Sequence, residues 1–183
     1  MKRFILTGAP GAGKTVLLRQ LELDGYSVVE EAATGLIALW QARGTAEPWT
    51  QPAFIDQVAE LQRQRLIHTP SGDLHVQFHD RSIFCTEALA NYLGHPISDF
   101  MAQELARIKR EKFFQQRVIF VRSLGFVTPT EARRISLQDA LRFERIHEEI
   151  YRHFGFELVF IESGSLPDRI AAIKKFVETD SPA

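Results

Sequence analysis

The chain contains 183 residues, of which 45% are hydrophobic and 25% are charged, so it is long and apolar enough to bury a core. Lys and Arg number 22 against 23 Asp and Glu, and the net charge of −1 argues against a broad nucleic-acid-binding surface or a polybasic membrane patch. Cys85 is the only cysteine, which excludes an intrachain disulfide and argues against a cysteine-based zinc site. We expect one domain over residues 1–183, without a transmembrane segment, in a reducing compartment that is most simply the cytoplasm.

Five short apolar runs have the lengths and residue types of buried β-strands. They are Phe4–Thr7, Ser27–Glu30, Leu74–His79, Arg117–Arg122 and Glu157–Ile161. Helical patterns separate these runs, and that alternation is typical of an α/β fold whose mainly parallel sheet is covered on both faces. We expect His75 and His79, in the third run, to lie on the strand surface rather than to bind a metal, because no third ligand is evident.

A glycine-rich segment joins the first predicted strand to a helix that starts near Lys14. It matches the phosphate-loop pattern G-x-x-x-x-G-K-S/T with the residues Gly8, Ala9, Pro10, Gly11, Ala12, Gly13, Lys14 and Thr15, and Val16 follows. Glycines let successive N–H groups turn toward a polyphosphate, and the helix dipole adds positive charge. Lys14 is expected to reach the β- and γ-phosphates and the Thr15 hydroxyl to ligate Mg²⁺. The segment therefore predicts binding of ATP, with GTP as the alternative, together with Mg²⁺.

The segment after the second strand is longer than a simple crossover requires. Residues of about 34–70 hold two stretches with helical spacing, a turn-rich break between them, and the large aromatic residues Trp40, Trp49 and Phe54. We expect a helical insertion over the sheet edge that shapes a substrate pocket. The aromatic residues suit a pocket wall and a core equally well, so the alternative that the insertion only covers the core stays open.

Two later helices have start signals. Thr128–Glu131 fits a capping box with proline at the first helical position, which predicts a long helix from Thr128. Helical spacing places four apolar side chains of that helix toward the core, namely Phe143, Ile146, Ile150 and Phe154. Ser165 begins a similar pattern and predicts the last helix.

Three further motifs follow the phosphate loop GAPGAGKT in order: VVEEAA at 28–33, HDRS at 79–82 and EARRIS at 131–136. With these motifs and the ending GFELVFIESGS at 155–165, nearly the whole chain resembles the AAA-like P-loop ATPase/kinase domain family. That family includes the ribosylnicotinamide kinase domain of NadR and is related to nucleoside and nucleotide kinases. The resemblance implies a three-layer α/β/α P-loop NTPase fold with a five-stranded sheet of kinase-type order 2-3-1-4-5. It also implies that the loop Glu162–Ser165 borders the nucleotide base.

Acidic residues follow the second and third predicted strands. Asp80 ends the third strand, and strand ends line the ligand crevice of a parallel sheet. Its carboxylate could therefore hold Mg²⁺ directly or through water. The alternative is that Asp80 is a turn or helix-cap residue. Glu31 takes the place of the family's acidic residue, where it could accept the proton of an acceptor hydroxyl. Glu30 replaces a proline of the family pattern, so the assignment between the two glutamates stays open. The alternative is that Glu31 is a solvated glutamate in the first turn of the next helix, where the helix dipole favours a negative charge.

Three arginines are candidates for binding phosphate. Arg81 could clamp the acceptor or a phosphate in a bidentate manner, or it could form an ion pair with Glu30 or Glu31. Arg133 and Arg134 fall in the region of about 124–136 where kinases of this type carry a lid. A lid arginine would stabilise the charge of the transferring phosphate, whereas the alternative is a solvated basic face.

These residues together predict an Mg²⁺-dependent P-loop enzyme that transfers the γ-phosphoryl group of ATP to a nucleoside-like or other hydroxyl-bearing metabolite. The expected partners are a nucleotide and a small-molecule acceptor, and the sequence favours no nucleic acid, protein or phospholipid partner. Two alternatives remain: a nucleotide-switched binding protein and an NTPase without an acceptor. No clear N-K-x-D guanine motif is present, which favours ATP over GTP.

Overall fold

A computed structural model describes residues 1–68, 75–126 and 135–180 of the chain. Within these residues, a five-stranded parallel sheet has the order β2-β3-β1-β4-β5. Its strands are β1 (Lys2–Thr7), β2 (Ser27–Val29), β3 (Val76–Asp80), β4 (Arg117–Val121) and β5 (Glu157–Ile161). The order and the parallel pairing confirm the predicted kinase-type P-loop fold.

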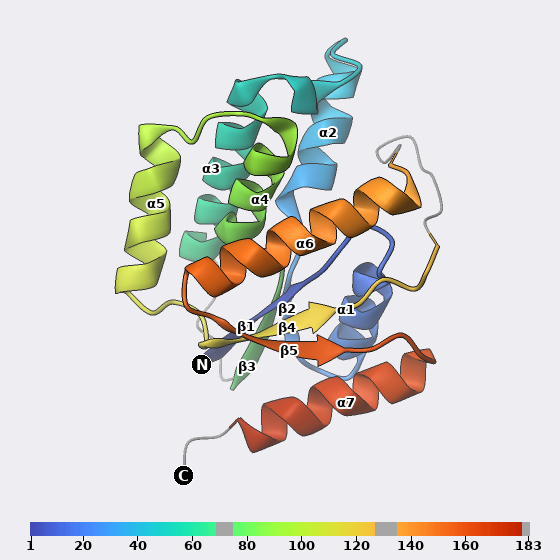
Figure 1. Ribbon diagram of the computed structural model, residues 1–183. Helices are drawn as coiled ribbons and strands as arrows, with labels where there is room; N and C mark the ends of the chain where they lie inside the picture. The colour runs from blue at the N-terminus through green and yellow to red at the C-terminus, as the bar shows by residue number, and fades with distance from the viewer. Residues whose placement is uncertain (69–74, 127–134, 181–183) are drawn as a thin grey trace.

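Helices cover both faces of the sheet, as Figure 1 shows. The helices in the described ranges are α1 (Lys14–Leu23), α2 (Ala32–Ala42), a 3₁₀ turn (Pro48–Thr50), α3 (Pro52–His68), α4 (Ile83–Leu93), α5 (Asp99–Arg110), α6 (Leu137–His153) and α7 (Leu166–Thr179). One face carries α2 to α6 over a core that includes Ile5, and the other carries α1 and α7 around Phe4 and Leu6. Alternate residues of the central strand β1 enter different cores, which explains its unbroken apolar run. In the part of the chain that is described, no helix has the length and apolar character to cross a bilayer.

The carboxyl ends of three strands lie level at one edge of the sheet. Leu6 of β1 pairs with Asp80 of β3, and Val29 of β2 pairs with His79 of β3. The segments that follow β1, β2 and β3 therefore leave the sheet side by side. In an open parallel sheet this is the edge where ligands bind, so the register alone brings three distant parts of the sequence into one region.

The long helix α6 begins later than the sequence predicts. Its first residue is Leu137, and the hydroxyl of Ser136 accepts a hydrogen bond from the backbone N–H of Asp139 at 3.1 Å. Ser136 has extended backbone angles, so the helix cannot continue back through it, and the predicted start at Thr128 is wrong for this helix. The predicted capping box at 128–131 itself lies outside the described residues. The last helix, α7, starts where predicted, with Ser165 as its cap.

His79 is buried, which contradicts its expected place on a strand surface. It is only 3% exposed, its ring packs edge-on against Phe114 with 5.0 Å between centroids, and its Nε2 lies 2.9 Å from Oε1 of Gln77. The strand β3 lies inside the sheet, between β2 and β1, with helices over both faces, so its side chains from Gln77 to Asp80 are buried. Burial and, to a lesser extent, the charge of Arg3 lower the pKa of His79 to about 3.

Candidate active site

The phosphate loop joins β1 to α1 by a backbone path that needs glycine. Gly8, Gly11 and Gly13 have φ angles of 131°, 82° and 81°, which L side chains rarely adopt. Gly8 also lies so close to β4 that a Cβ atom there would be 2.1 Å from the carbonyl oxygen of Val121. The loop is therefore pressed against the central strands, and Gly13 is the residue from which α1 starts.

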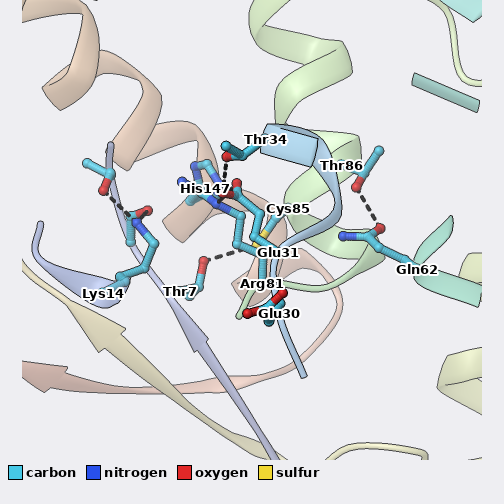
Figure 2. A network of polar contacts seen from close by, with 12 residues as sticks. Thr7, Lys14, Glu30, Glu31, Thr34, Gln62, Arg81, Cys85, Thr86 and His147 are labelled. Atoms are coloured by element: carbon cyan, nitrogen blue, oxygen red, sulfur yellow. Dashed lines mark hydrogen bonds and ion pairs between the residues drawn. The ribbon is translucent and has the colours of Figure 1, made fainter. Parts of the chain in front are cut away.

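Lys14 holds the loop together from inside. Lys14 is buried, with 7% of its surface exposed. Its Nζ donates hydrogen bonds to the carbonyl oxygens of Gly8 at 3.0 Å and Ala9 at 2.8 Å. Figure 2 shows these contacts beside the end of β1. Thr15 and Val16, by contrast, are exposed in the first turn of α1, where backbone N–H groups lack intrahelical acceptors. The segment thus combines a buried cation, an accessible hydroxyl and a helix N-terminus, which is the chemistry that a polyphosphate requires.

Arg169 of α7 supports the phosphate loop from outside, and no sequence motif indicated it. Its side chain is buried, and its Nη2 donates to the carbonyl oxygen of Ala12 at 2.9 Å and to that of Arg122 at 3.4 Å. Burial lowers the pKa of its guanidinium. Because the two carbonyls belong to the loop and to the end of β4, Arg169 ties the loop to the sheet. The only sequence signal is its position in the first turns of α7, four residues after the cap Ser165.

The structure distinguishes the two glutamates at the end of β2. Glu31 forms an ion pair with Arg81, with 2.8 Å between Oε1 and Nε, and its Oε2 accepts a hydrogen bond from the Thr34 hydroxyl at 2.7 Å. Glu30 instead pairs with Arg19 on the exposed surface of α1. Of the two, Glu31 lines the cavity described below. The ion pair that the sequence offered as an alternative role for Arg81 is therefore present, and it lies at the site.

Arg81 has a strained backbone and a tightly surrounded side chain. Its φ of 68° is rare for a residue other than glycine, and its backbone N–H donates to the carbonyl oxygen of Leu6 at 3.0 Å. Its Nη1 lies 3.1 Å from Nε2 of His147 on α6, a contact that Figure 2 places next to Glu31. Burial by itself would lower the pKa of Arg81, but its neighbours, Glu31 first and then Cys85, Asp80 and Tyr151, together raise the pKa above its ordinary value. Arg81 is therefore a permanently charged group fixed at the end of β3.

Asp80 and Thr15 supply oxygen donors at the same edge of the sheet. Asp80 is the last residue of β3 and is 8% exposed, while Thr15 lies in the first turn of α1. A carboxylate and a hydroxyl are the hard oxygen ligands that suit Mg²⁺, an ion that proteins commonly hold with one or two side chains together with nucleotide phosphates. The donor set thus fits the ion that the sequence predicts.

A cavity of about 420 Å³ opens between the phosphate loop and the helices of the predicted insertion. Glu31, Arg81 and Pro10 of the loop are among the residues that line it. Most of the lining is apolar or aromatic and comes from α2, the 3₁₀ turn, α3, α4 and α6, through Ile37, Trp49, Phe54, Val58, Leu89, Tyr92, Leu93 and Phe143. Residues of the predicted insertion thus line this cavity and also pack into the buried core.

Three aromatic side chains of the insertion divide between these roles. Trp49 and Phe54 line the cavity. Trp40 packs edge-on against Phe54 and donates its indole N–H to Gln57 at 2.7 Å, so it supports the wall from behind. Gln62, another lining residue that the sequence analysis did not identify, accepts a hydrogen bond from the Thr86 hydroxyl at 2.8 Å (Figure 2).

A buried polar cluster lies behind Arg81. The hydroxyl of Tyr151 contacts the hydroxyl of Ser82 at 2.8 Å and Sγ of Cys85 at 3.0 Å, and Thr7 reaches the same sulfur at 3.0 Å. Burial, followed by the neighbouring Cys85, raises the pKa of Tyr151 well above its ordinary value. Cys85 is thus a packing residue, and the cluster anchors the start of α4 against α6.

Three predictions concern the lid and the loop after β5. Arg133 and Arg134 lie outside the described residues. The loop Glu162–Ser165 is exposed after β5, and its last residue caps α7.

Comparisons with known proteins agree with the geometry. The model of a family described as AAA domain matches residues 3–169. The structure of deoxyadenosine kinase from M. mycoides with bound dATP is similar, with a TM-score of 0.63 at 12% identity over 96% of this chain and 99% of that one.

A second similar structure is the NadR protein in complex with NR, with a TM-score of 0.69 at 17% identity over the whole of this chain. The same protein in complex with NAD and AMP-PNP gives a TM-score of 0.68 at 16% identity. This chain spans about half the length of the NadR chain, 52% and 51% in the two structures. A comparison with curated protein sequences gives no match. The matched model covers most of the chain, and the chain therefore belongs to the AAA domain family, with a fold shared by P-loop kinases.

Proposed function

We propose that this protein is an Mg²⁺-dependent kinase that transfers the γ-phosphoryl group of ATP to the hydroxyl of a nucleoside-like metabolite. One observation carries the proposal: a single cavity is bordered by the phosphate loop at Pro10 and by the Glu31–Arg81 pair, and it continues into an apolar, aromatic pocket. A protein that only binds a nucleotide has no need of an aromatic pocket for another molecule beside the phosphate loop. A kinase requires one, because the acceptor must lie next to the phosphate that it attacks.

The residues of the chain fit separate parts of phosphoryl transfer. The acceptor oxygen forms a bond to the γ-phosphorus, the bond from that phosphorus to the bridging oxygen of ADP breaks, and the hydroxyl proton passes to Glu31. Lys14 exchanges its loop carbonyls for β- and γ-phosphate oxygens. Arg81, held beside Glu31, stabilises the charge that develops on the transferring group. Arg133 or Arg134 would cover that group from the lid.

Thr15 and Asp80 are the residues that would hold Mg²⁺. When bound, the ion neutralises phosphate charge and orients the triphosphate. The chain contributes two hard oxygen donors and leaves the remaining coordination positions to phosphate and water. Asp80→Asn should therefore weaken magnesium-dependent turnover more than it weakens nucleotide binding.

The acceptor class follows from the cavity. A volume of about 420 Å³ accommodates a small metabolite, its aromatic lining suits a flat ring, and Glu31 in the lining is available to a hydroxyl. Two structurally similar proteins support the same class, since one is named a deoxyadenosine kinase and the other is seen with NR. Nicotinamide riboside and the common nucleosides are the first acceptors to test.

The test is a transfer assay with ATP or GTP, Mg²⁺ and a panel of hydroxyl-bearing metabolites, in which phosphorylated product is detected by mass spectrometry. Glu31→Gln should lower kcat about 100-fold or more, the range expected for loss of a general base, with nucleotide affinity retained. Glu30→Gln is the matched control, because Glu30 faces solvent and pairs with Arg19, and it should keep near-normal turnover. Equal losses in both variants would contradict the role given to Glu31.

Other outcomes of the assay identify the alternatives. Hydrolysis of ATP that no acceptor accelerates would indicate a plain NTPase. Binding of GTP in preference to ATP, without acceptor-stimulated turnover, would indicate a nucleotide switch. Either result would overturn the kinase proposal.

A further inference from the structure

We infer that His147 is a positioning residue, whose neutral imidazole accepts a hydrogen bond from Arg81 and holds that guanidinium beside Glu31 at the cavity. The inference rests on the proposed kinase function, which it deepens by adding α6 to the machinery. His147 lies in the middle of α6, is 0% exposed, and belongs to none of the motifs in the sequence. No phosphate-binding or metal-binding role is needed to explain it.

The hydrogen-bond partners of the imidazole determine its tautomer. Nδ1 lies 2.8 Å from the backbone carbonyl oxygen of Phe143, which can only accept, so Nδ1 carries the hydrogen. Nε2 lies 3.1 Å from Nη1 of Arg81, which can only donate, so Nε2 supplies the lone pair. Both neighbours thus require the same neutral form. A protonated imidazole would point an N–H at the guanidinium and lose this contact.

The charges around the ring favour the same form. Burial lowers the pKa of His147 well below its ordinary value, the charge of Arg81 lowers it further, and Lys14 adds a smaller effect of the same sign. The hydrogen bond to Phe143 opposes them only in part. The two cations come from different elements, since Arg81 follows β3 and Lys14 begins α1.

The contact gives Arg81 a second fixed point. Its Nε is held by Glu31 at the start of α2, and its Nη1 is held by His147 of α6. The guanidinium therefore bridges two helices that both line the cavity, α2 through Ile37 and α6 through Phe143. Loss of His147 would remove one of these contacts and loosen the angle of the guanidinium plane, and an error of about 1 Å in a catalytic group can cost on the order of 100-fold in rate.

Nitrogen NMR of the histidine side chains tests the inference without any substrate. In ¹⁵N-labelled protein, the His147 resonances should show the Nδ1–H tautomer from pH 8 to about pH 5, with assignment by their loss in His147→Leu. In the same variant the Nε–H signal of Arg81 should shift and broaden, because one of its two anchors is gone. An Nε2–H tautomer, ordinary titration, or an unchanged Arg81 signal would overturn the inference even if no acceptor were ever found.

Kinetics then test the consequence for transfer. His147→Leu should lower kcat by about 10- to 100-fold while KM for ATP changes less than about 3-fold. His147→Gln, whose amide oxygen can accept from Arg81, should recover part of that loss. His153→Leu, at an exposed position of the same helix, is the matched control and should resemble the parent protein. Equal kcat values for the Leu and Gln variants would show a packing role only, and would refute the positioning role.

Discussion

Acidification from pH 7 to pH 5 should cost this protein about 2 kcal/mol of unfolding free energy through His79 alone. The side chain is buried and packs against Phe114, and its pKa falls from 6.5 to about 3 on folding. The unfolded chain therefore binds a proton below pH 6.5 that the folded chain rejects until about pH 3. Stability from this group is complete above pH 6.5 and declines as the pH falls through that window. At pH 5, about 1.5 units below the unfolded pKa, the loss is about 1.5 × 1.36 kcal/mol, or about 2 kcal/mol.

Urea unfolding at pH 7 and pH 5 measures this loss directly. His79→Gln keeps a polar partner for Gln77 but removes the titration, so its stability should fall less between the two pH values than that of the parent, by about 2 kcal/mol. His75→Gln, at an exposed position one residue before β3, is the control and should keep the parent's pH dependence. His147 contributes with the same sign, so the variant should retain a reduced slope. If His79→Gln and His75→Gln lost equal stability on acidification, the burial argument for His79 would be refuted.

Three further variants test the architecture of the site. Gly8→Ala should destabilise the fold by about 1–3 kcal/mol and abolish tight ATP binding in calorimetry, because its Cβ would meet a β4 carbonyl. The control Gly35→Ala, in open space on α2, should stabilise the fold by about 0.5–1 kcal/mol. Arg169→Met should weaken ATP binding while secondary structure by circular dichroism is retained, since the loop loses its tie to β4; unchanged affinity would argue against that support. Tyr151→Phe should lower the unfolding free energy by about 1–3 kcal/mol in urea titration, because the buried Ser82 hydroxyl loses a partner, and a neutral effect would contradict the proposed anchoring of α4.

The elements of the fold were predictable from the sequence because their signals are local. A strand shows as a short apolar run, and the phosphate loop as glycines at defined spacing before a lysine, since backbone curvature and anion binding need those residues within one turn. The cap at Ser165 was equally visible, because a helix N-terminus is satisfied by a side chain three residues away. The start of α6 was not, since Thr128 and Ser136 both offer a cap and only the backbone angles of Ser136 decide between them.

The composition of the site depended on contacts that no short stretch of sequence contains. Glu30 and Glu31 are neighbours with the same chemistry, and they separate only because Arg19 of α1 takes one and Arg81 after β3 takes the other. His147 and Arg169 belong to no motif, and each acquires its place by the packing of a distant helix on a strand end. Local chemistry thus determined a phosphate-binding loop on a parallel sheet, whereas strand register and helix packing decided which charged side chains surround it, because ion pairs and burial join residues that are far apart along the chain.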